Sequence, residues 1–419
     1  MDDRPTLLIL GAGIDQSYPI CIAREEGLRV LAADSNPNAP AFPLADEAAV
    51  VSNRDLEGLK NLCDESARRG FPVKGVLVMG VDIPHIAAEL ALHLGVPGPS
   101  LDTGRWTTNK FLMKERLAKA GVAVPWYSLV NSADHLKQLI REHGGERFVL
   151  KPTDRSGARG VFQIRAEDEN LDYLYVQARD ESFTAEVQVE EYIPGNQIST
   201  ESILLKGKAY TPGFVDRNYE MLDRFAPHII ENGGIHPTLV TGPQKAAVMD
   251  LVERAAQALG IENGVAKGDV VIAPDGTPMI IEMAARLSGG DFSESLIPLG
   301  CGVNIVKAAI RVAIGQAPDV STLCDRWERI LANRYFFGNP GRLMAIHGLE
   351  EARALPWVHK IDIYVHPGEF IGKMKFHAGR LGVFIVEASD RVELAERLSH
   401  IYELIRFEIE LDANHEIYC

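Results

Sequence analysis

Short apolar runs alternate with amphipathic segments over the first hundred residues. The runs Thr6–Leu10, Leu28–Ala33 and Gly75–Met79 are each followed at once by a glycine or an aspartate. Segments with helical periodicity lie between and after them: Pro19–Glu26, Leu56–Arg69 and Ile83–Leu94. Short apolar strands separated by helices predict a parallel, doubly wound α/β sheet.

The pattern changes after Pro99 to longer strands and hairpins. Helices are expected at Asn109–Ala120 and Gln244–Leu259. Strand-like segments occupy much of the remaining middle region: Arg147–Lys151, Val161–Arg165, Thr184–Ile193, Ser199–Lys206, Lys208–Phe214, Asp269–Ala273 and Pro278–Met283. Gly207 and the run Pro274-Asp275-Gly276 are turn signals, so the last four segments are expected to form two hairpins. This region is predicted to be α+β and two-lobed.

A third pattern begins near Arg329. Strand-like segments at Lys360–Tyr364, Gly382–Glu387 and Ile405–Leu411 surround a helix expected at Arg391–Leu404. The sequence therefore predicts a Rossmann-like domain at 1–108, a two-lobed region at 109–328 and a small α+β domain at 329–419.

Composition and charge exclude some partners. Of the 419 residues 46% are apolar, and the formal net charge of −15 repels nucleic acid and anionic membranes on average. No apolar run approaches the ~20 residues that cross a bilayer, and the N-terminus does not resemble a signal peptide. The five scattered cysteines form no CxxC pair, which is typical of reduced thiols. We therefore expect a cytoplasmic protein with small-molecule partners.

A partial dinucleotide fingerprint follows the first strand. Gly11-Ala12-Gly13 precedes a helix, and Asp34 ends the second strand, but the third glycine position holds Gln16. Without that glycine the helix packs less closely on the strand, so an NAD or FAD site is the weaker interpretation. The stronger one is a tight turn whose amides bind a substrate anion.

Two lysines and a glycine-rich loop are candidate phosphate contacts. Lys110 opens a predicted helix, Lys151 ends a strand, and the loop Asp154–Gly160 follows. Positive charge and loop amides bind polyphosphate without chemistry of their own. Each feature alone has an ordinary alternative, a solvated surface lysine or a plain hairpin loop.

An acidic pair and an arginine are candidate metal and substrate contacts. Asp269 and Glu282 flank the Pro-Asp-Gly turn, so antiparallel pairing brings their carboxylates together. Paired hard oxygen ligands suit Mg²⁺ on phosphates. Arg286 follows, and a fixed guanidinium there holds a carboxylate or an acyl-phosphate bidentately. The extended segment Glu190–Ile193 offers backbone groups to an adenine. Exposed strand carboxylates and an ordinary strand end are the alternatives.

The order of these motifs resembles the ATP-grasp superfamily over residues 5–320. The motifs are a GxG-containing Rossmann-like domain, Asn109-Lys110, Val149-Leu150-Lys151-Pro152, a Ser/Gly-rich loop, Glu190-Glu191-Tyr192-Ile193-x-Gly195, and an acidic pair ending in Glu282-x-x-x-Arg286. The final motif is similar to that of bacterial L-amino-acid ligases. The segment Asp34–Pro40 resembles purine-pathway members, and the tail around Arg380 resembles biotin carboxylase-like members.

The resemblance implies an ADP-forming ligase that joins a carboxylate to an amine using ATP and Mg²⁺, with Mn²⁺ as a substitute. It implies that residues 109–195 are the small lobe and hinge, and 196–328 the large lobe with the metal site. The implied nucleotide contacts are Lys110, Lys151, Ser156, Gly157, Ala158, Arg159, Gly160, Glu190, Glu191, Tyr192, Ile193 and Gln197. Asp269 and Glu282 are the implied metal ligands, and Arg286 and Lys151 the catalytic residues. Dimers are common among relatives, which leaves a homodimer open.

Three positions depart from the superfamily pattern. Gln197 replaces the usual ribose-binding glutamate, and Ala284 replaces an asparagine near the second metal ligand, which puts a second Mg²⁺ in doubt. Ala158 stands where the loop often has serine.

The leading function from the sequence is thus a carboxylate–amine ligase. A purine-type enzyme that transfers activated formate or bicarbonate to a ribonucleotide amine is the first alternative. A nucleotide-binding protein without ligase activity and a dehydrogenase are the others. The segment Gly213–His236 lies where a variable substrate loop is expected.

Overall fold

The computed structural model describes residues 3–411, and the chain divides into two compact units. The first unit contains residues up to 127 together with 193–214 and 239–327. The second unit contains residues 128–192, 215–238 and those from 328 onward. Of the predicted features, Cys419 lies outside the described residues.

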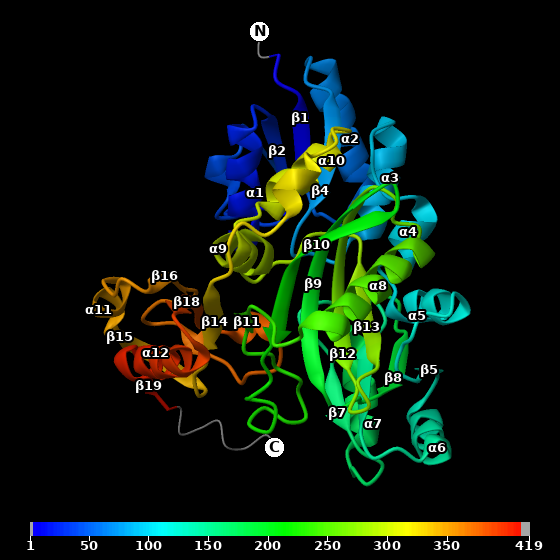
Figure 1. Ribbon diagram of the computed structural model, residues 1–419, viewed down its shortest axis with the longest axis vertical. Helices are drawn as coiled ribbons and strands as arrows, with labels where there is room; N and C mark the ends of the chain where they lie inside the picture. The colour runs from blue at the N-terminus through cyan, green and yellow to red at the C-terminus, as the bar shows by residue number, and fades with distance from the viewer. Residues whose placement is uncertain (1–2, 412–419) are drawn as a thin grey trace. The chain divides into compact units, whose positions relative to one another are not determined.

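A parallel sheet opens the first unit, as the alternating pattern predicted (Figure 1). Its strand order is β3-β2-β1-β4: β1 (Thr6–Leu10), β2 (Arg29–Asp34), β3 (Glu47–Val50) and β4 (Val73–Val78). The helices of this part are α1 (Ile14–Glu25), α2 (Leu56–Arg68) and α3 (Pro84–Leu94). The strand β1 is completely buried, which explains why it reads as an uninterrupted apolar run.

The rest of the first unit is an antiparallel arrangement of strands covered by helices. The strand order is β13-β12-β9-β10: β9 (Asn196–Leu205), β10 (Lys208–Arg217, ending in the second unit), β12 (Gly264–Ile272) and β13 (Pro278–Ala284). The helices are α4 (Leu101–Trp106), α5 (Lys110–Lys119), α8 (Gly242–Ala258), α9 (Ile297–Cys301) and α10 (Ile305–Ala313). Both predicted strand pairs, β9 with β10 and β12 with β13, are present.

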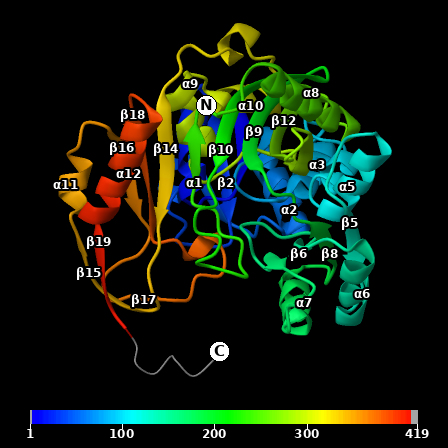
Figure 2. The ribbon, with the colours of Figure 1, turned by 60° about the horizontal axis from the view of Figure 1, so that its bottom comes forward.

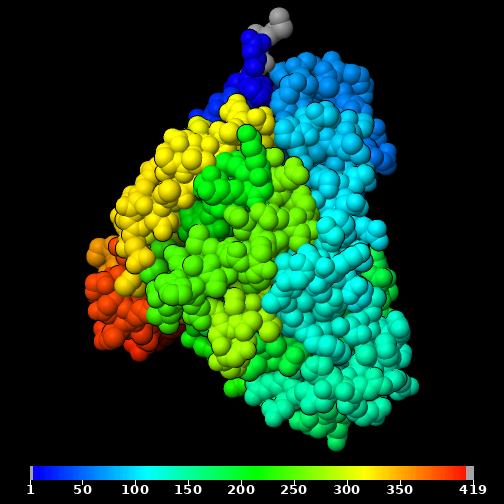
Figure 3. Space-filling view, turned by 45° about the vertical axis from the view of Figure 1, so that its right-hand side comes forward, coloured from blue at the N-terminus to red at the C-terminus, as the bar shows by residue number. Residues whose placement is uncertain are grey.

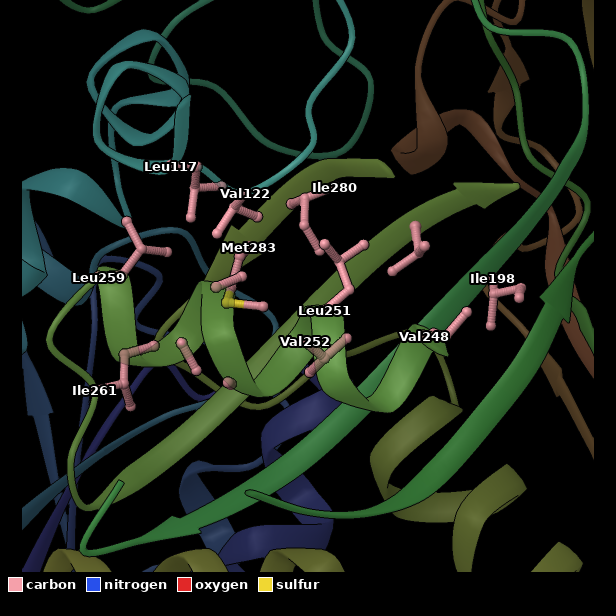
Figure 4. Packing of buried hydrophobic residues seen from close by; sticks show 14 of the residues in the cluster. Leu117, Val122, Ile198, Val248, Leu251, Val252, Leu259, Ile261, Ile280 and Met283 are labelled. Atoms are coloured by element: carbon pink, nitrogen blue, oxygen red, sulfur yellow. The ribbon is translucent and has the colours of Figure 1, made fainter. Parts of the chain in front are cut away.

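The helix α8 seals one face of these strands. Its Leu251 and Val252 belong to a buried apolar cluster with Ile280 and Met283 of β13 and Leu117 of α5 (Figure 4). The helices α5 and α8 pack against each other (Figure 3). Because β13 and the start of α5 are both fixed by this core, the polar residues that they carry are held rigidly.

The second unit begins with a four-stranded sheet. Its order is β5-β8-β6-β7: β5 (Tyr127–Val130), β6 (Phe148–Pro152), β7 (Phe162–Ile164) and β8 (Val187–Glu191). The helices α6 (Ala133–His143) and α7 (Leu171–Glu181) accompany it. The sequence analysis did not predict these two helices, because their surfaces are largely polar.

The C-terminal part completes the second unit (Figure 2). Neighbouring strands are β11 (Gly234–His236), β14 (Ile330–Phe336), β18 (Gly382–Ala388) and β16 (Val358–Ile363). A smaller sheet has the order β17-β15-β19: β15 (Gly341–His347), β17 (Phe370–Ile371) and β19 (Arg406–Glu410). The helices are α11 (Leu349–Arg353) and α12 (Arg391–Leu404), and α12 packs on β14 and β18. Among the described residues, no helix is long and apolar enough to cross a membrane.

Candidate active site

The predicted acidic pair is formed by two neighbouring strands of the first unit. Asp269 on β12 and Glu282 on β13 are directly paired residues of the antiparallel ladder, next to a register shift after Asp269. Asp269 is buried, and the hydroxyl of Ser199 donates to its Oδ1 at 2.8 Å. Two carboxylates at one place provide oxygen ligands of the kind that Mg²⁺ prefers.

Each carboxylate of the pair is matched by a lysine. Lys110 Nζ lies 3.4 Å from Glu282 Oε1, and Lys267 of β12 contacts Asp269. Burial disfavours the charge of Lys110, but Glu282 and Asp82 more than offset this and raise its pKa. Lys110 begins α5, where Asn109 caps the helix by accepting from the backbone N–H groups of Phe111 and Leu112. The ammonium group of Lys267 is a second positive charge at this place, and the sequence analysis missed it.

Arg286 is held by a partner from the N-terminal sheet region of the same unit. Its Nε and Nη2 lie 2.6 and 2.5 Å from Asp82 Oδ1, and both side chains are nearly buried. Burial opposes ionisation of Asp82, yet Arg286, Lys110 and Lys267 together lower its pKa. The guanidinium is therefore fixed in place beside the acidic pair as an ion pair of low mobility.

Asp82→Asn is expected to lower turnover about tenfold while leaving the KM for nucleotide nearly unchanged. The asparagine keeps the shape and one acceptor, but loses the charge that orients Arg286, and misplacement of a catalytic group reduces the rate. Steady-state kinetics on the purified variant measure this split. The matched control is Asp46→Asn, which removes the carboxylate bound 2.8 Å from Arg4 in the same unit. A raised KM with unchanged kcat would show that Asp82 acts elsewhere.

The segment after Arg286 is fastened from two further directions. Leu287 pairs with Met79 beside β4, and Gly80 N–H donates to Leu287 O at 3.0 Å. Gly289 has no room for a side chain, because an added Cβ would stand 2.1 Å from Asp15 Oδ2. Asp15, in the first turn of α1, accepts from the Gly290 N–H at 3.3 Å and so contacts this segment through its carboxylate.

Glu201 of β9 is a buried carboxyl beneath the same segment. It accepts from Ser288 N–H at 2.6 Å and from the Ser293 hydroxyl at 2.5 Å, and it is fully inaccessible to solvent. Burial raises the pKa of Glu201 to about 6, although both hydrogen bonds oppose the rise. No sequence signal marked this residue, since an acidic side chain inside a strand is ordinarily exposed.

Glu201→Gln is expected to change how stability depends on pH. The pKa of Glu201 is raised from 4.5 to about 6 on folding, so the folded chain binds this proton more tightly. The free energy of unfolding therefore falls by up to about 2 kcal/mol as pH rises through this window. Glutamine cannot titrate; its amide oxygen still accepts from the Ser288 N–H, whereas its NH₂ group must donate to the Ser293 hydroxyl instead of accepting from it. Urea unfolding at pH 4.5 and 7 should show a smaller pH-dependent loss in the variant; equal losses would contradict the buried titration.

The predicted phosphate contact Lys151 belongs to the second unit. At the end of β6 its Nζ lies 2.6 Å from Glu190 Oε1 of β8, and both side chains are buried. Gln188 donates to the same oxygen at 2.6 Å. Glu191 lies on the other face near His143, and Tyr192 continues the strand end. Ile193 and Gln197 belong to the first unit, with Gln197 on β9.

The glycine-rich loop has an unusual backbone. Gly157, Ala158 and Gly160 all have φ between 61° and 66°, and for alanine this conformation is costly. Asp154 anchors the loop by accepting from Ser182, Phe183 and Thr184. Within the loop the Arg159 N–H donates to Ser156 O at 3.5 Å, and the Val161 N–H donates to Ala158 O at 3.4 Å.

The structure thus gathers the predicted residues into two groups. The first unit contains Lys110, Asp269, Glu282 and Arg286 close together, joined by Asp82 and Lys267, which the sequence analysis missed. The second unit contains Lys151, Glu190 and the glycine-rich loop from Ser156 to Gly160. Ala284 ends β13 fully buried and offers no third metal ligand. Among the described residues no group of three His, Cys, Asp or Glu side chains could hold a metal ion.

Comparison with known protein families gives two matches. The ATP-grasp domain family matches residues 107–290, and the L-amino acid ligase C-terminal domain 2 family matches residues 334–410. Uncharacterized protein y4rH of Sinorhizobium fredii is 26% identical over 371 residues, which cover 87% of this chain and 75% of that protein. The L-arginine-specific L-amino acid ligase of Bacillus subtilis is 21% identical over 360 residues, covering 83% and 84%.

Solved structures share the fold. The L-amino acid ligase from Bacillus licheniformis has a TM-score of 0.82 at 20% identity and covers 97% of this chain and 99% of its own. The carboxyaminoimidazole ribonucleotide synthase from Aspergillus clavatus, complexed with ATP, has a TM-score of 0.75 at 17% identity and covers 96% and 99%. At these identities the likeness establishes the fold alone.

The fold, the motif order and the family match identify residues 107–290 as an ATP-grasp domain. Residues 334–410 match the C-terminal domain family found in L-amino acid ligases. The fold and family expected from the motifs are therefore confirmed.

Proposed function

We propose that this protein is an ADP-forming ligase that joins an amino acid or another small carboxylic acid to an amine. The observation that carries the proposal is a set of three ion pairs in the first unit: Lys110 with Glu282, Lys267 with Asp269, and Arg286 with Asp82. The C-terminal match to L-amino acid ligases supports an amino acid as the acid that is activated.

The proposed reaction has two steps that balance without an enzyme nucleophile. A carboxylate oxygen of the substrate bonds to the γ-phosphorus of ATP, and the bond to the bridging oxygen breaks, which releases ADP. The amine then bonds to the carbonyl carbon of the acyl-phosphate, phosphate leaves, and the amine loses a proton. Both steps depend on positioning and on neutralisation of negative charge.

The residues of the first unit have distinct parts in this proposal. Asp269 and Glu282 would hold Mg²⁺, which neutralises phosphate charge when bound. Lys110 and Lys267 are held on these carboxylates in the present structure. With the carboxylates bound to a metal ion, both lysines would contact phosphate oxygens instead. Arg286, fixed by Asp82, would stabilise the oxyanion that forms at the acyl carbon.

The assignments of the remaining predicted residues complete the proposal. Lys151 and the loop Ser156–Gly160 would contact nucleotide phosphates, and Glu190, Glu191, Tyr192 and Ile193 would hold adenine. Gln197 would bind the ribose. Mn²⁺ in place of Mg²⁺, a homodimer, a cytoplasmic location and the division at 108, 195 and 328 remain predictions of the same proposal.

A phosphate-release screen tests the function. Pairs of L-amino acids are supplied with ATP and Mg²⁺, and ADP, phosphate and the coupled product are quantified. The expected result is equimolar ADP, phosphate and an amide product for some pairs and none for a single amine lacking a carboxylate. AMP and diphosphate as products would contradict the proposal.

The purine-type alternative rests on the similarity to the ATP-bound ribonucleotide synthase. It predicts that an aminoimidazole or glycinamide ribonucleotide, with bicarbonate or formate, stimulates ADP formation. Stimulation by these and by no amino acid pair would replace the first proposal. ATP binding without ADP formation in either arm would favour a nucleotide-binding protein without ligase activity.

A further inference from the structure

The glycine-rich loop is held by a segment of the C-terminal part within the same unit. The backbone N–H of His377 donates to the carbonyl oxygen of Gly157 at 3.0 Å. The guanidinium of Arg159 lies 5.0 Å from the centre of the Phe376 ring, within the range of a cation–π contact. Two successive residues of the C-terminal part therefore contact two loop residues, one by the backbone and one by a side chain.

A second set of contacts joins the same segments through the predicted substrate loop. Gln163 of β7 donates to Pro227 O at 2.8 Å, and the Phe162 ring lies 5.3 Å from the His228 ring. Burial lowers the pKa of His228, and the charges of Lys375 and Lys373 lower it further. The substrate segment is thus in contact with β7, the strand that follows the loop, and feels the charge of the C-terminal part.

Several basic side chains lie in these three segments. Arg155 and Arg159 belong to the loop, His228 to the substrate segment, and the exposed Lys373 and Lys375 to the C-terminal part. The charge of Arg155 opposes that of Arg159, and the charges of Lys375 and Lys373 oppose protonation of His228. Glu181, whose carboxylate lies 2.8 Å from Arg155, offsets part of this positive charge. In a chain with a net charge of −15, such a gathering favours a polyanionic ligand at this place.

The loop backbone needs an external support. Ala158 has φ 61° between two glycines that also have positive φ. A non-glycine residue keeps this conformation only where its surroundings fix it. The two contacts from Phe376 and His377 lie directly on either side of Ala158, at Gly157 and Arg159.

We propose that the segment Lys373–His377 is a brace for the phosphate-binding loop. In this assignment Phe376 is a positioning residue for Arg159, and the His377 N–H fixes Gly157. The C-terminal part thereby takes part in nucleotide binding. Only the identity of the polyanion as ATP rests on the proposed function; the brace itself does not.

The first test measures the loop without any nucleotide. Hydrogen exchange of the amides at residues 155–160 is compared in the full-length wild type, Phe376→Leu and Phe376→Tyr. Leucine fills much of the space but has no ring, so exchange is expected to accelerate several-fold, whereas tyrosine restores protection. The control is Phe370→Leu, an exposed phenylalanine on β17 of the same part. Unchanged exchange in folded Phe376→Leu would overturn the brace.

A second variant addresses the backbone contact and guards against misfolding of the first. His377 begins a short 3₁₀ turn, a position where proline is tolerated. His377→Pro removes the N–H that Gly157 accepts, and His377→Ala keeps it. Faster loop exchange in the proline variant only is expected; equal exchange in both would contradict the assignment.

The nucleotide arm separates the brace from the proposed function. Binding of AMP-PNP with Mg²⁺ by calorimetry is expected to weaken about three- to tenfold in Phe376→Leu and to return in Phe376→Tyr. If wild type fails to bind AMP-PNP, the proposed function fails while the exchange result still decides the brace. If wild type binds and Phe376→Leu binds equally well, the brace has no part in nucleotide binding and the inference is wrong.

Discussion

Glu282→Gln is expected to lower ADP formation at least about 1000-fold, because a lost metal ligand removes several kcal/mol of charge stabilisation. Glutamine has nearly the same shape as glutamate. The Glu282 side chain is only 21% exposed, and its strand is fixed by the core. Stability should change by about 1 kcal/mol, since Lys110 loses one carboxylate but retains the attraction of Asp82. Coupled ADP assays, with unfolding curves on the same samples, measure both quantities.

The matched control is Glu47→Gln. Glu47 is also a strand glutamate of the first unit, and it is paired with Arg29 at 2.8 Å and with Arg69. Its loss should lower stability without changing turnover per folded molecule. If Glu282→Gln gives that pattern instead, Glu282 is a structural carboxylate, and the acidic pair does not hold the catalytic metal. The activity that remains in Glu282→Gln should need a higher Mg²⁺ concentration to reach half of its maximum, which would support the metal role directly.

The parts of the site that sequence could predict share one property: their signals are local. Asp269 and Glu282 flank a Pro-Asp-Gly turn, so the hairpin that pairs them is encoded within one short segment. Lys110 sits directly after a capping asparagine. Turn chemistry and capping act over a few residues, and these are the interactions that a single sequence reveals.

The parts that sequence missed depend on long-range packing. Asp82 and Arg286 are separated by 204 positions, and nothing near Asp82 indicates that a distant arginine needs a partner. Glu201 stands in a strand with several polar residues, where an acidic side chain is expected to be exposed, but the segment Ser288–Ser293 covers it. Lys267 lies outside the strand predicted at Asp269–Ala273, and no motif marked it. The brace at Phe376 belongs to the same class, since its partner loop lies far away in the sequence.

The fold followed the same rule. The parallel strands β1 and β2 are buried along almost their whole length, and β4 is buried except at Lys74 and Val76, so their apolar runs were recognisable. The strand β3 has alternating exposure and no apolar run, and α6 and α7 are largely polar at the surface, so propensity alone did not reveal them. Tertiary contacts decide the conformation of such segments.

Arg286→Lys is expected to lower kcat about 100- to 1000-fold while leaving the affinity for AMP-PNP within about twofold. Lysine keeps the charge that Asp82 requires, so the buried carboxylate is not left alone and the fold survives. It cannot reproduce the planar fork that binds Asp82 and, in the proposal, the developing oxyanion at once. Single-turnover measurements of ADP release with saturating substrate isolate this chemical step.

The control is Arg29→Lys, because Arg29 is comparably buried and forms a 2.8 Å ion pair with Glu47. It should alter stability and leave kcat unchanged. Combining Arg286→Lys with Asp82→Asn tests whether the two residues act as one unit: the double variant should be little slower than Arg286→Lys alone. Independent, multiplicative losses would mean that Asp82 does not work through Arg286, and the oxyanion role would then have to be reassigned to Lys267, the remaining cation beside Asp269.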